Sequence, residues 1–235
     1  MLGPTEYSPV PVIRAWDETH AFRGLRLALP PALARAHAVP GQVVKIRTEE
    51  GEGFFALASA PDPAGAADLL VKRGGRVADA AIARGVAGTA LELTEPFGKG
   101  FPMQEATGKD LLLFAAGSGI APVRALVQHV LGHRSDFGRA TLFYGQRHGA
   151  EFAYRGEHIL WERGGVLVVL CPSRADDAWD GVRGRVQEVA RVLSFGGSPP
   201  EETVAFVSGM KAMVEDVRRT LAEAGIPPGR VHANF

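Results

Sequence analysis

Cysteine is almost absent from this 235-residue chain, which has only one, Cys171. A single cysteine cannot form an internal disulfide, and it cannot hold an iron–sulfur cluster by itself. The sequence also has no apolar run of ~18 residues, the length of a membrane-spanning helix. Its first residues lack the basic and apolar segments of a secretory signal. We therefore expect a cytoplasmic protein without a membrane span.

An excess of one charge is also missing, because 26 lysines and arginines balance 26 aspartates and glutamates. Nucleic-acid-binding proteins usually carry a basic excess, so no nucleic acid partner is expected. Ser118 lacks the flanking glycines of a hydrolase Gly-x-Ser-x-Gly elbow. His129 and His133 are spaced like metal ligands on a helix, but no third ligand accompanies them, so no metal site is predicted.

The first part of the chain, residues 7–102, has short runs in which apolar and polar residues alternate between proline- and glycine-rich turns. The strands that this pattern predicts are 23–29, 42–47, 54–58, 68–72 and 89–93. One short helix is expected over 77–84. Strands of this length and spacing are typical of a small antiparallel β-barrel.

From residue 110 the pattern changes to uninterrupted apolar runs separated by helical periodicity. The apolar runs are 111–116, 141–144, 166–170 and 203–207, and helices are expected over 182–193 and 211–224. Such runs are typical of a parallel sheet that is covered by helices on both faces. The sequence therefore predicts an α+β protein of two domains. An antiparallel barrel occupies residues 1–104, and an α/β domain with a parallel sheet occupies residues 105–235.

The segment 110–124, DLLLFAAGSGIAPVR, is the most informative part of the chain. An apolar strand runs into Gly117 and Gly119, and a helix follows at once with Pro122 in its first turn. Glycine lets the backbone approach a ligand closely, and a helix N-terminus attracts phosphate. The segment predicts a phosphate-binding turn, with a plain strand-to-helix turn as the alternative.

The other predicted parallel strands end in residues of a similar kind. The ends are 116–118, 144–147, 171–174 and 208–210. In a parallel sheet these ends meet at one edge, where ligands bind. Glycine leaves room there, and arginine can pair with phosphate. The sequence thus predicts a crevice that suits a dinucleotide.

Five segments together resemble the ferredoxin–NADP⁺ reductase superfamily of flavin- and NAD(P)-binding oxidoreductases. They are GSGIAPVR (117–124), LFYGQR (142–147), GRVQE (184–188), EPFGKGF (95–101) and the segment 207–235. The resemblance implies that the barrel binds FAD and that the second domain binds NADP or NAD. It also implies hydride transfer between nicotinamide and flavin, followed by electron transfer to an acceptor. A ferredoxin, a quinone, a small molecule and oxygen are all open as that acceptor.

The chain departs from the flavin-binding signature of this family, Arg-x-Tyr-Ser, which here becomes Gly-Phe-Phe-Ala over 53–56. Phe55 keeps a ring face that can stack on a flavin, but the contacts of the arginine and the serine are lost. The second flavin site of the family, a Gly-x-Val-Ser/Thr turn, becomes Gly-Arg-Val-Ala over 75–78. Its helix N-terminus can still hold a pyrophosphate, and we expect Arg76 to replace the missing arginine.

The resemblance also assigns residues near the nicotinamide. Ser208 stands where many relatives have a cysteine, so slower hydride transfer is expected. The last residue, Phe235, covers the flavin or packs against the sheet edge. Ser173 and Arg174 resemble the pair that relatives use for the 2′-phosphate of NADP, and Arg185 adds charge, so NADPH is slightly favoured over NADH.

The expected catalytic positions are Ser208 and Phe235. The residues expected to bind the two cofactors are Phe54, Phe55, Ala56, Leu57, Ala58, Ser59, Val71, Lys72, Gly75, Arg76, Val77, Ala78, Gly117, Ser118, Gly119, Ile120, Ala121, Pro122, Tyr144, Gly145, Arg147, Ser173, Arg174, Gly209 and Met210. The incomplete flavin signature leaves an alternative open. In that alternative the chain is a reductase-like protein that has lost flavin and acts as a binding or regulatory subunit.

Overall fold

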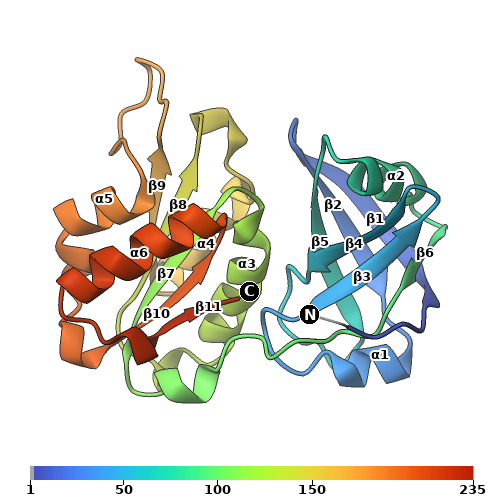
Figure 1. Cartoon of the computed structure of the whole chain (residues 1–235), viewed down its shortest axis with the longest axis horizontal. Helices are drawn as coiled ribbons and strands as arrows, with labels where there is room; N and C mark the ends of the chain where they lie inside the picture. The colour runs from blue at the N-terminus through green and yellow to red at the C-terminus, as the bar shows by residue number, and fades with distance from the viewer. Residues whose placement is uncertain (1–2, 235) are drawn as a thin grey trace.

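A computed structural model describes residues 3–234 and places two sheets side by side, one antiparallel and one parallel (Figure 1). The antiparallel sheet is built from the first part of the chain and the parallel sheet from the second. The predicted fold class, a barrel followed by an α/β unit, is confirmed. No helix within residues 3–234 has the length and apolarity needed to cross a membrane.

The antiparallel sheet has six strands in the order β4-β3-β6-β1-β2-β5. Its strands are β1 (Ser8–Thr19), β2 (Phe22–Ala28), β3 (Val43–Thr48), β4 (Gly51–Ala56), β5 (Ala66–Lys72) and β6 (Ala90–Leu93). A bridge between Leu57 and Leu69 joins the two outer strands and closes the sheet into a barrel. The side chains that alternate inward, such as Leu25, Ile46 and Leu91, form its core.

Two helices accompany the barrel, α1 (Pro31–Ala36) and α2 (Arg76–Arg84). Ala81 of α2 is fully buried against the barrel core, so this helix caps one end of the barrel. The sequence pattern had predicted α2 and missed α1. The reason is that Pro31 fills the first turn of α1, where proline starts a helix instead of breaking it.

Strand β1, the longest strand of the barrel, was also not predicted. Pro9 and Pro11 interrupt its apolar alternation, and proline is usually read as a strand breaker. In the structure both prolines lie in register with β6, opposite Glu92 and Ala90. The remainder of β1 pairs with β2 through Val12 and Trp16, with irregular register at both ends.

The parallel sheet has five strands in the order β11-β10-β7-β8-β9. Its strands are β7 (Asp110–Ala116), β8 (Ala140–Gln146), β9 (Val166–Pro172), β10 (Thr203–Ser208) and β11 (Val231–Ala233). Its helices are α3 (Ile120–Gly132), α4 (Arg155–Arg163), α5 (Val186–Val192) and α6 (Lys211–Glu223). Short 3-10 turns are η1 (Met103–Ala106), η2 (Gly117–Gly119), η3 (Arg134–Asp136), η4 (Gly149–Glu151), η5 (Ser194–Gly197), η6 (Pro200–Glu202) and η7 (Pro228–Arg230).

Helices cover both faces of the parallel sheet. Leu111 and Leu113 of β7 pack in one apolar cluster with side chains of α3 and α4. Leu112 and Phe114 point to the other face and pack with side chains of α5 and α6. This burial on both faces explains why the strands are continuous apolar runs, as predicted.

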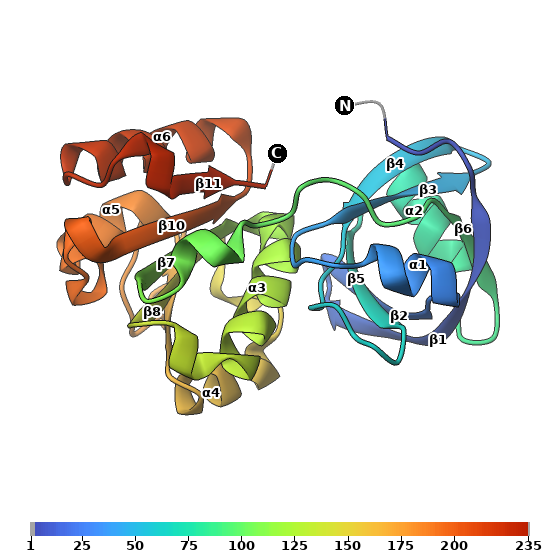
Figure 2. The same ribbon diagram turned by 90° about the horizontal axis from the view of Figure 1, so that it is seen from below.

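The strand order reverses at β7. Strands β8 and β9 extend the sheet to one side, and the chain then crosses over to place β10 and β11 on the other side. Ligands of open parallel sheets bind at the carboxyl ends of the strands where this reversal occurs. Helix α3, which follows β7, is the helix that faces the barrel in both views (Figures 1 and 2).

Candidate functional site

A cavity of about 1480 Å³ opens between the barrel and the carboxyl edge of the parallel sheet. The barrel contributes β4, β5 and the start of α2, and the other unit contributes the loops that follow β7, β8, β9 and β10. Single-ligand pockets usually measure ~300–1,000 Å³, so this cavity has room for more than one ligand.

On the barrel side, the cavity is lined by Phe55 and by the residues around it. The Phe55 ring is half-buried and packs against the barrel core. A Cβ atom at Gly53 would approach this ring and Val77 to 3.1 Å, so the space of a side chain at 53 is taken by Phe55 and Val77. Phe54, which is 58% exposed, meets Phe97 edge-on with 6.2 Å between ring centroids.

The N-terminus of α2 opens into the same part of the cavity. Gly75 precedes the helix in an extended conformation, and the residues 75–78 line the cavity. The first N–H groups of a helix have no partner within it and carry partial positive charge. This end of the cavity can therefore receive an anion.

Arg76 and Glu50 form an ion pair at this lip. The Arg76 Nη2 atom lies 2.6 Å from Glu50 Oε2, and both residues line the cavity. Arg76, which was expected to replace the missing arginine, is thus near the helix N-terminus but already holds a carboxylate. Arg73 instead pairs with Asp17 and is not among the lining residues.

On the other side of the cavity, the turn after β7 meets the end of β10. Gly117 has a φ of +57°, which favours glycine. A Cβ atom at Gly119 would lie 2.2 Å from the carbonyl oxygen of Ser208, so only glycine lets the two backbones approach so closely. Helix α3 begins directly after this turn, and its N-terminus is aimed at the strand reversal.

Arginines gather along the rim formed by the ends of β8 and β9. Arg147, Arg174 and Arg185 all line the cavity. The loops that carry the first two are tied together, because the backbone N–H of Arg174 donates to the carbonyl of Arg147 at 2.8 Å. Arg185 lies 3.9 Å from Asp216, which also lines the cavity. The rim can therefore bind an anionic group.

Ser208 is buried at the end of β10, and its neighbour Met210 is 75% exposed. Both line the cavity with Gly209. Cys171 also borders the cavity, but burial raises the pKa of its thiol to about 12, so it stays protonated and unreactive. Phe235 lies outside the described residues.

Most of the sequence-predicted positions come together around this one cavity. They are Phe54, Phe55, Ala56, Lys72, Gly75, Arg76, Val77, Ala78, Gly117, Ser118, Gly119, Ala121, Pro122, Gly145, Arg147, Ser173, Arg174, Ser208, Gly209 and Met210. Residues from both sheets, far apart in the sequence, therefore share one site.

Six predicted positions are not among the lining residues. Leu57 and Val71 are in the barrel core, and Ile120 and Tyr144 are in the core beneath the parallel sheet. The Ala58 carbonyl accepts a hydrogen bond from Arg124, and the Ser59 hydroxyl accepts one from the backbone N–H of Asp68. These six residues therefore pack or form hydrogen bonds inside the protein and do not border the cavity.

Several residues that line the cavity were not predicted from the sequence. Phe22 and Ala21 come from the β1–β2 hairpin, Glu50 from the β3–β4 turn, and Met213 and Asp216 from α6. Met213 and Asp216 lie in the helix that was expected over 211–224, for which no ligand contact was predicted. For Glu50 the sequence holds no signal, because its position depends on how the turn folds over α2.

Comparisons with known proteins agree with this arrangement. Residues 113–219 match the family described as "Oxidoreductase NAD-binding domain". The gamma subunit of sulfhydrogenase 1 from Pyrococcus furiosus is 32% identical over 154 residues, which are 63% of this chain and 52% of that protein. The electron transfer subunit of dihydroorotate dehydrogenase B from Shouchella clausii is 30% identical, covering 51% of each chain. The chain thus spans about half the length of these curated relatives.

A solved structure, a ferredoxin NADP⁺ reductase from Neisseria gonorrhoeae with bound FAD and NADP, superposes with a TM-score of 0.82 at 20% identity. The match covers 99% of this chain and 100% of that one, so the fold is shared over both units. Residues 113–219 thus match an NAD-binding oxidoreductase domain, and the chain has the two-unit fold of this reductase over nearly its whole length.

Proposed function

We propose that this chain binds FAD on the barrel side of the cavity and NADPH or NADH on the other side. It then transfers hydride between the two and passes the electrons to a further acceptor. We place the domain boundary between residues 104 and 105, with the flavin domain before it and the nucleotide domain after it. The observation that carries the proposal is the single large cavity lined by both units.

The residues on the barrel side fit a flavin. Phe55 offers a half-buried ring face for stacking, and Ala56 leaves space beside it without offering a hydrogen bond. The N–H groups at the start of α2 suit a pyrophosphate. Lys72, which lines the cavity, adds positive charge.

The residues on the other side fit a nicotinamide dinucleotide. The Gly117–Gly119 turn and the start of α3 offer N–H groups to its phosphates. Arg174 and Arg147 on the rim favour an additional 2′-phosphate, because a guanidinium can pair with phosphate through two hydrogen bonds. We therefore infer a preference for NADPH.

When bound, the flavin supplies the chemistry of accepting a hydride and releasing electrons. Hydride transfer between the two rings needs no strong acid or base from the protein. Its residues bind the two ligands, exclude water and fix the distance between the reacting atoms. Ser208 and Gly209, at the strand reversal, border the space where the two ligands meet.

The acceptor is inferred from the relatives, which are described as a sulfhydrogenase gamma subunit and an electron transfer subunit of dihydroorotate dehydrogenase B. We propose that this chain likewise works as a subunit that delivers electrons to a partner protein. A second candidate function is favoured by one observation, the Glu50 carboxylate at the start of α2. A carboxylate there repels a pyrophosphate, as expected of a reductase-like subunit that has lost flavin.

Titration of the purified chain with FAD separates the two candidates. The proposed function predicts uptake of one FAD per chain with quenching of flavin fluorescence. AMP and inorganic pyrophosphate, each added at the same concentration as FAD, should displace little of it if the Phe55 face contributes, because neither has a flavin ring. No uptake of FAD at micromolar concentration would favour the binding or regulatory subunit.

A further inference from the structure

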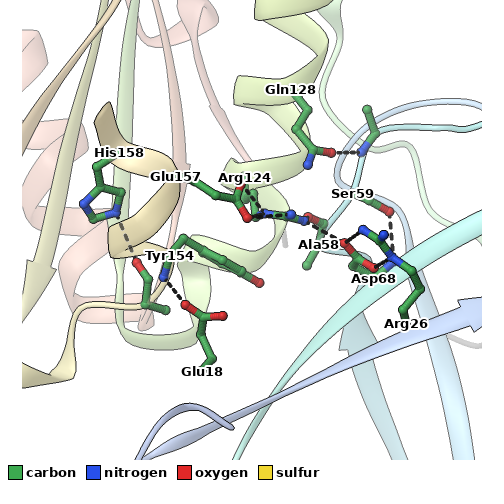
Figure 3. A network of polar contacts seen from close by, with 12 residues as sticks. Glu18, Arg26, Ala58, Ser59, Asp68, Arg124, Gln128, Tyr154, Glu157 and His158 are labelled. Carbon is green, nitrogen blue, oxygen red and sulfur yellow. Dashed lines mark hydrogen bonds and ion pairs between the residues drawn. The ribbon is translucent and has the colours of Figure 1, made fainter. Parts of the chain in front are cut away.

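Arg124 is a buried cation at the junction of the two units. Arg124 is 5% exposed. It belongs to α3 and lies on the side of this helix that meets the barrel. The Nη1 atom donates to the carbonyl of Ala58 at 2.6 Å and lies 3.1 Å from the Asp68 carboxylate. The Nη2 atom donates to Glu157 at 2.7 Å, and the guanidinium lies 4.6 Å from the centre of the Tyr154 ring (Figure 3).

These contacts run in two directions. Ala58 and Asp68 belong to the barrel, whereas Glu157 and Tyr154 belong to the start of α4 in the other unit. Burial opposes the charge of Arg124, but hydrogen bonds and charges, those of Glu157 foremost, outweigh this and raise its pKa. The guanidinium therefore remains charged and bridges the two units.

The barrel partner of Arg124 is itself firmly placed. Asp68 is 2% exposed and holds Arg26 through two hydrogen bonds of 2.7 and 2.9 Å. Its backbone N–H donates to the hydroxyl of Ser59 at 3.0 Å. Arg124 thus attaches to a fixed point of the barrel and not to a flexible surface side chain.

The position of this bridge relates it to the cavity. Asp68 lies on β5 two residues before Leu70, and Arg124 lies on α3 two residues after Pro122. Leu70 and Pro122 both line the cavity, from opposite sides. The bridge therefore joins the strand that supports the flavin side to the helix that supports the nicotinamide side.

We propose that Arg124 is a positioning residue that fixes the separation between the two halves of the cavity and thereby the approach of the nicotinamide to the flavin. This inference rests on the proposed function. A shift of about 1 Å between reacting groups can cost roughly 100-fold in rate, so a bridge of this kind controls the rate without touching either ligand.

Replacement of Arg124 by methionine is a clean test, because Asp68 keeps its pair with Arg26 and Glu157 can be solvated. The matched control is Arg26→Met, which removes the other partner of Asp68 but crosses no interface. The measured quantities are the affinities for FAD and NADP⁺ and the limiting rate at which NADPH reduces the bound flavin in a single turnover. We expect R124M to lower the limiting rate about 100-fold, with both affinities close to wild type, and R26M to change neither.

A second readout needs no flavin. Spin labels on cysteines introduced at Val86 and Val192, which are exposed on the barrel and on α5, report the distance between the two units. The native Cys171 is buried and is left in place. We expect one narrow distance distribution in the wild type and in R26M, and a broadened one in R124M.

Arg124→Lys is a second variant, which keeps the inference testable if R124M does not fold. Lysine can pair with Asp68 or Glu157 but lacks the planar fork that reaches both, so its rate and its distance distribution should both fall between those of wild type and R124M. A fall in rate without broadening, or broadening without a fall in rate, overturns the inference and leaves the proposed function intact. A wild-type chain that takes up no flavin overturns both.

Discussion

Gly119 lies so close to Ser208 that a single methyl group would not fit between them, since its Cβ would come within 2.2 Å of the Ser208 carbonyl oxygen. This approach joins the turn after β7 to the end of β10 at the reversal of strand order. The nucleotide side of the proposed site depends on it, because both segments line the cavity.

Gly119→Ala is therefore expected to push the two segments apart. Overpacking of this kind costs ~1–3 kcal/mol, so the affinity for NADP⁺ should fall by about fivefold or more, measured by isothermal titration. Gly132→Ala is the matched control, because Gly132 ends the same helix and its Cβ would meet nothing within 4 Å. Wild-type affinity in G119A would show that this close approach does not shape the nucleotide site.

The Glu50–Arg76 pair predicts opposite effects of two substitutions on FAD binding. Glu50→Gln removes a carboxylate beside the start of α2 and releases Arg76, so the affinity for FAD should rise. Arg76→Ala removes the cation and should lower it. A charge-assisted hydrogen bond is worth ~1.5–3 kcal/mol, which corresponds to a change of about tenfold or more in the dissociation constant, measured by fluorescence quenching.

The control for this pair is Glu49→Gln. Glu49 pairs with Arg84 at the other end of α2 and is not among the cavity residues. E49Q should bind FAD like the wild type. If E50Q and E49Q behave alike, or if R76A binds FAD normally, Arg76 does not stand in for the missing arginine.

Arg174 is expected to distinguish NADPH from NADH. Arg174→Ala should raise the dissociation constant for NADPH about tenfold and leave that for NADH nearly unchanged, because only NADPH has the 2′-phosphate. Arg183→Ala is a suitable control, since Arg183 is close in sequence but donates to the Trp179 carbonyl and does not line the cavity. An equal loss for both nucleotides would place Arg174 on the shared pyrophosphate instead.

Because His37 is buried, we expect the folded chain to lose stability in acid. Burial lowers its pKa from 6.5 to about 4, so between these values the unfolded chain binds a proton that the folded chain does not. Its contribution to stability is therefore present above pH 6.5 and is lost as the pH falls toward 4. The urea concentration at the midpoint of unfolding, measured by circular dichroism, should therefore fall as the pH is lowered over this range.

His37→Leu removes this titration and should fold with a smaller drop in midpoint between pH 7 and pH 4.5. His20 is exposed, so His20→Leu should keep the full drop of the wild type. Carboxylates titrate in all three proteins, and the comparison cancels them. An identical drop in H37L and wild type would mean that His37 does not contribute.

The sequence predicted those parts of the fold that local chemistry decides. The continuous apolar strands and the glycine turn at 117–119 follow from burial on both faces and from close backbone approach. The parts that it did not predict depend on distant partners. Strand β1 was missed because proline usually interrupts a strand, and the pairing of Pro9 and Pro11 with β6 has no signal in the local sequence. Helix α1 was missed because Pro31 starts it.

The same division applies to the candidate site. Ser118 could be placed at the cavity because strand and helix ends meet at one edge of a parallel sheet, and Gly75 because its segment resembles a flavin-binding turn. Glu50 and Arg124 could not, because an ion pair across a turn or across two domains leaves no local pattern. Leu57 and Val71 show the opposite case. They stand beside cavity residues in the sequence, and strand alternation turns them into the core.

The most direct test of the proposed function is to mix the FAD-loaded chain with NADPH under anaerobic conditions. The absorbance of the flavin band is then recorded over time. The proposed function predicts that one FAD is held per chain and that this band bleaches in a single turnover, faster with NADPH than with NADH. A chain that holds no FAD, or one whose bound FAD keeps its absorbance in the presence of excess NADPH, would contradict it.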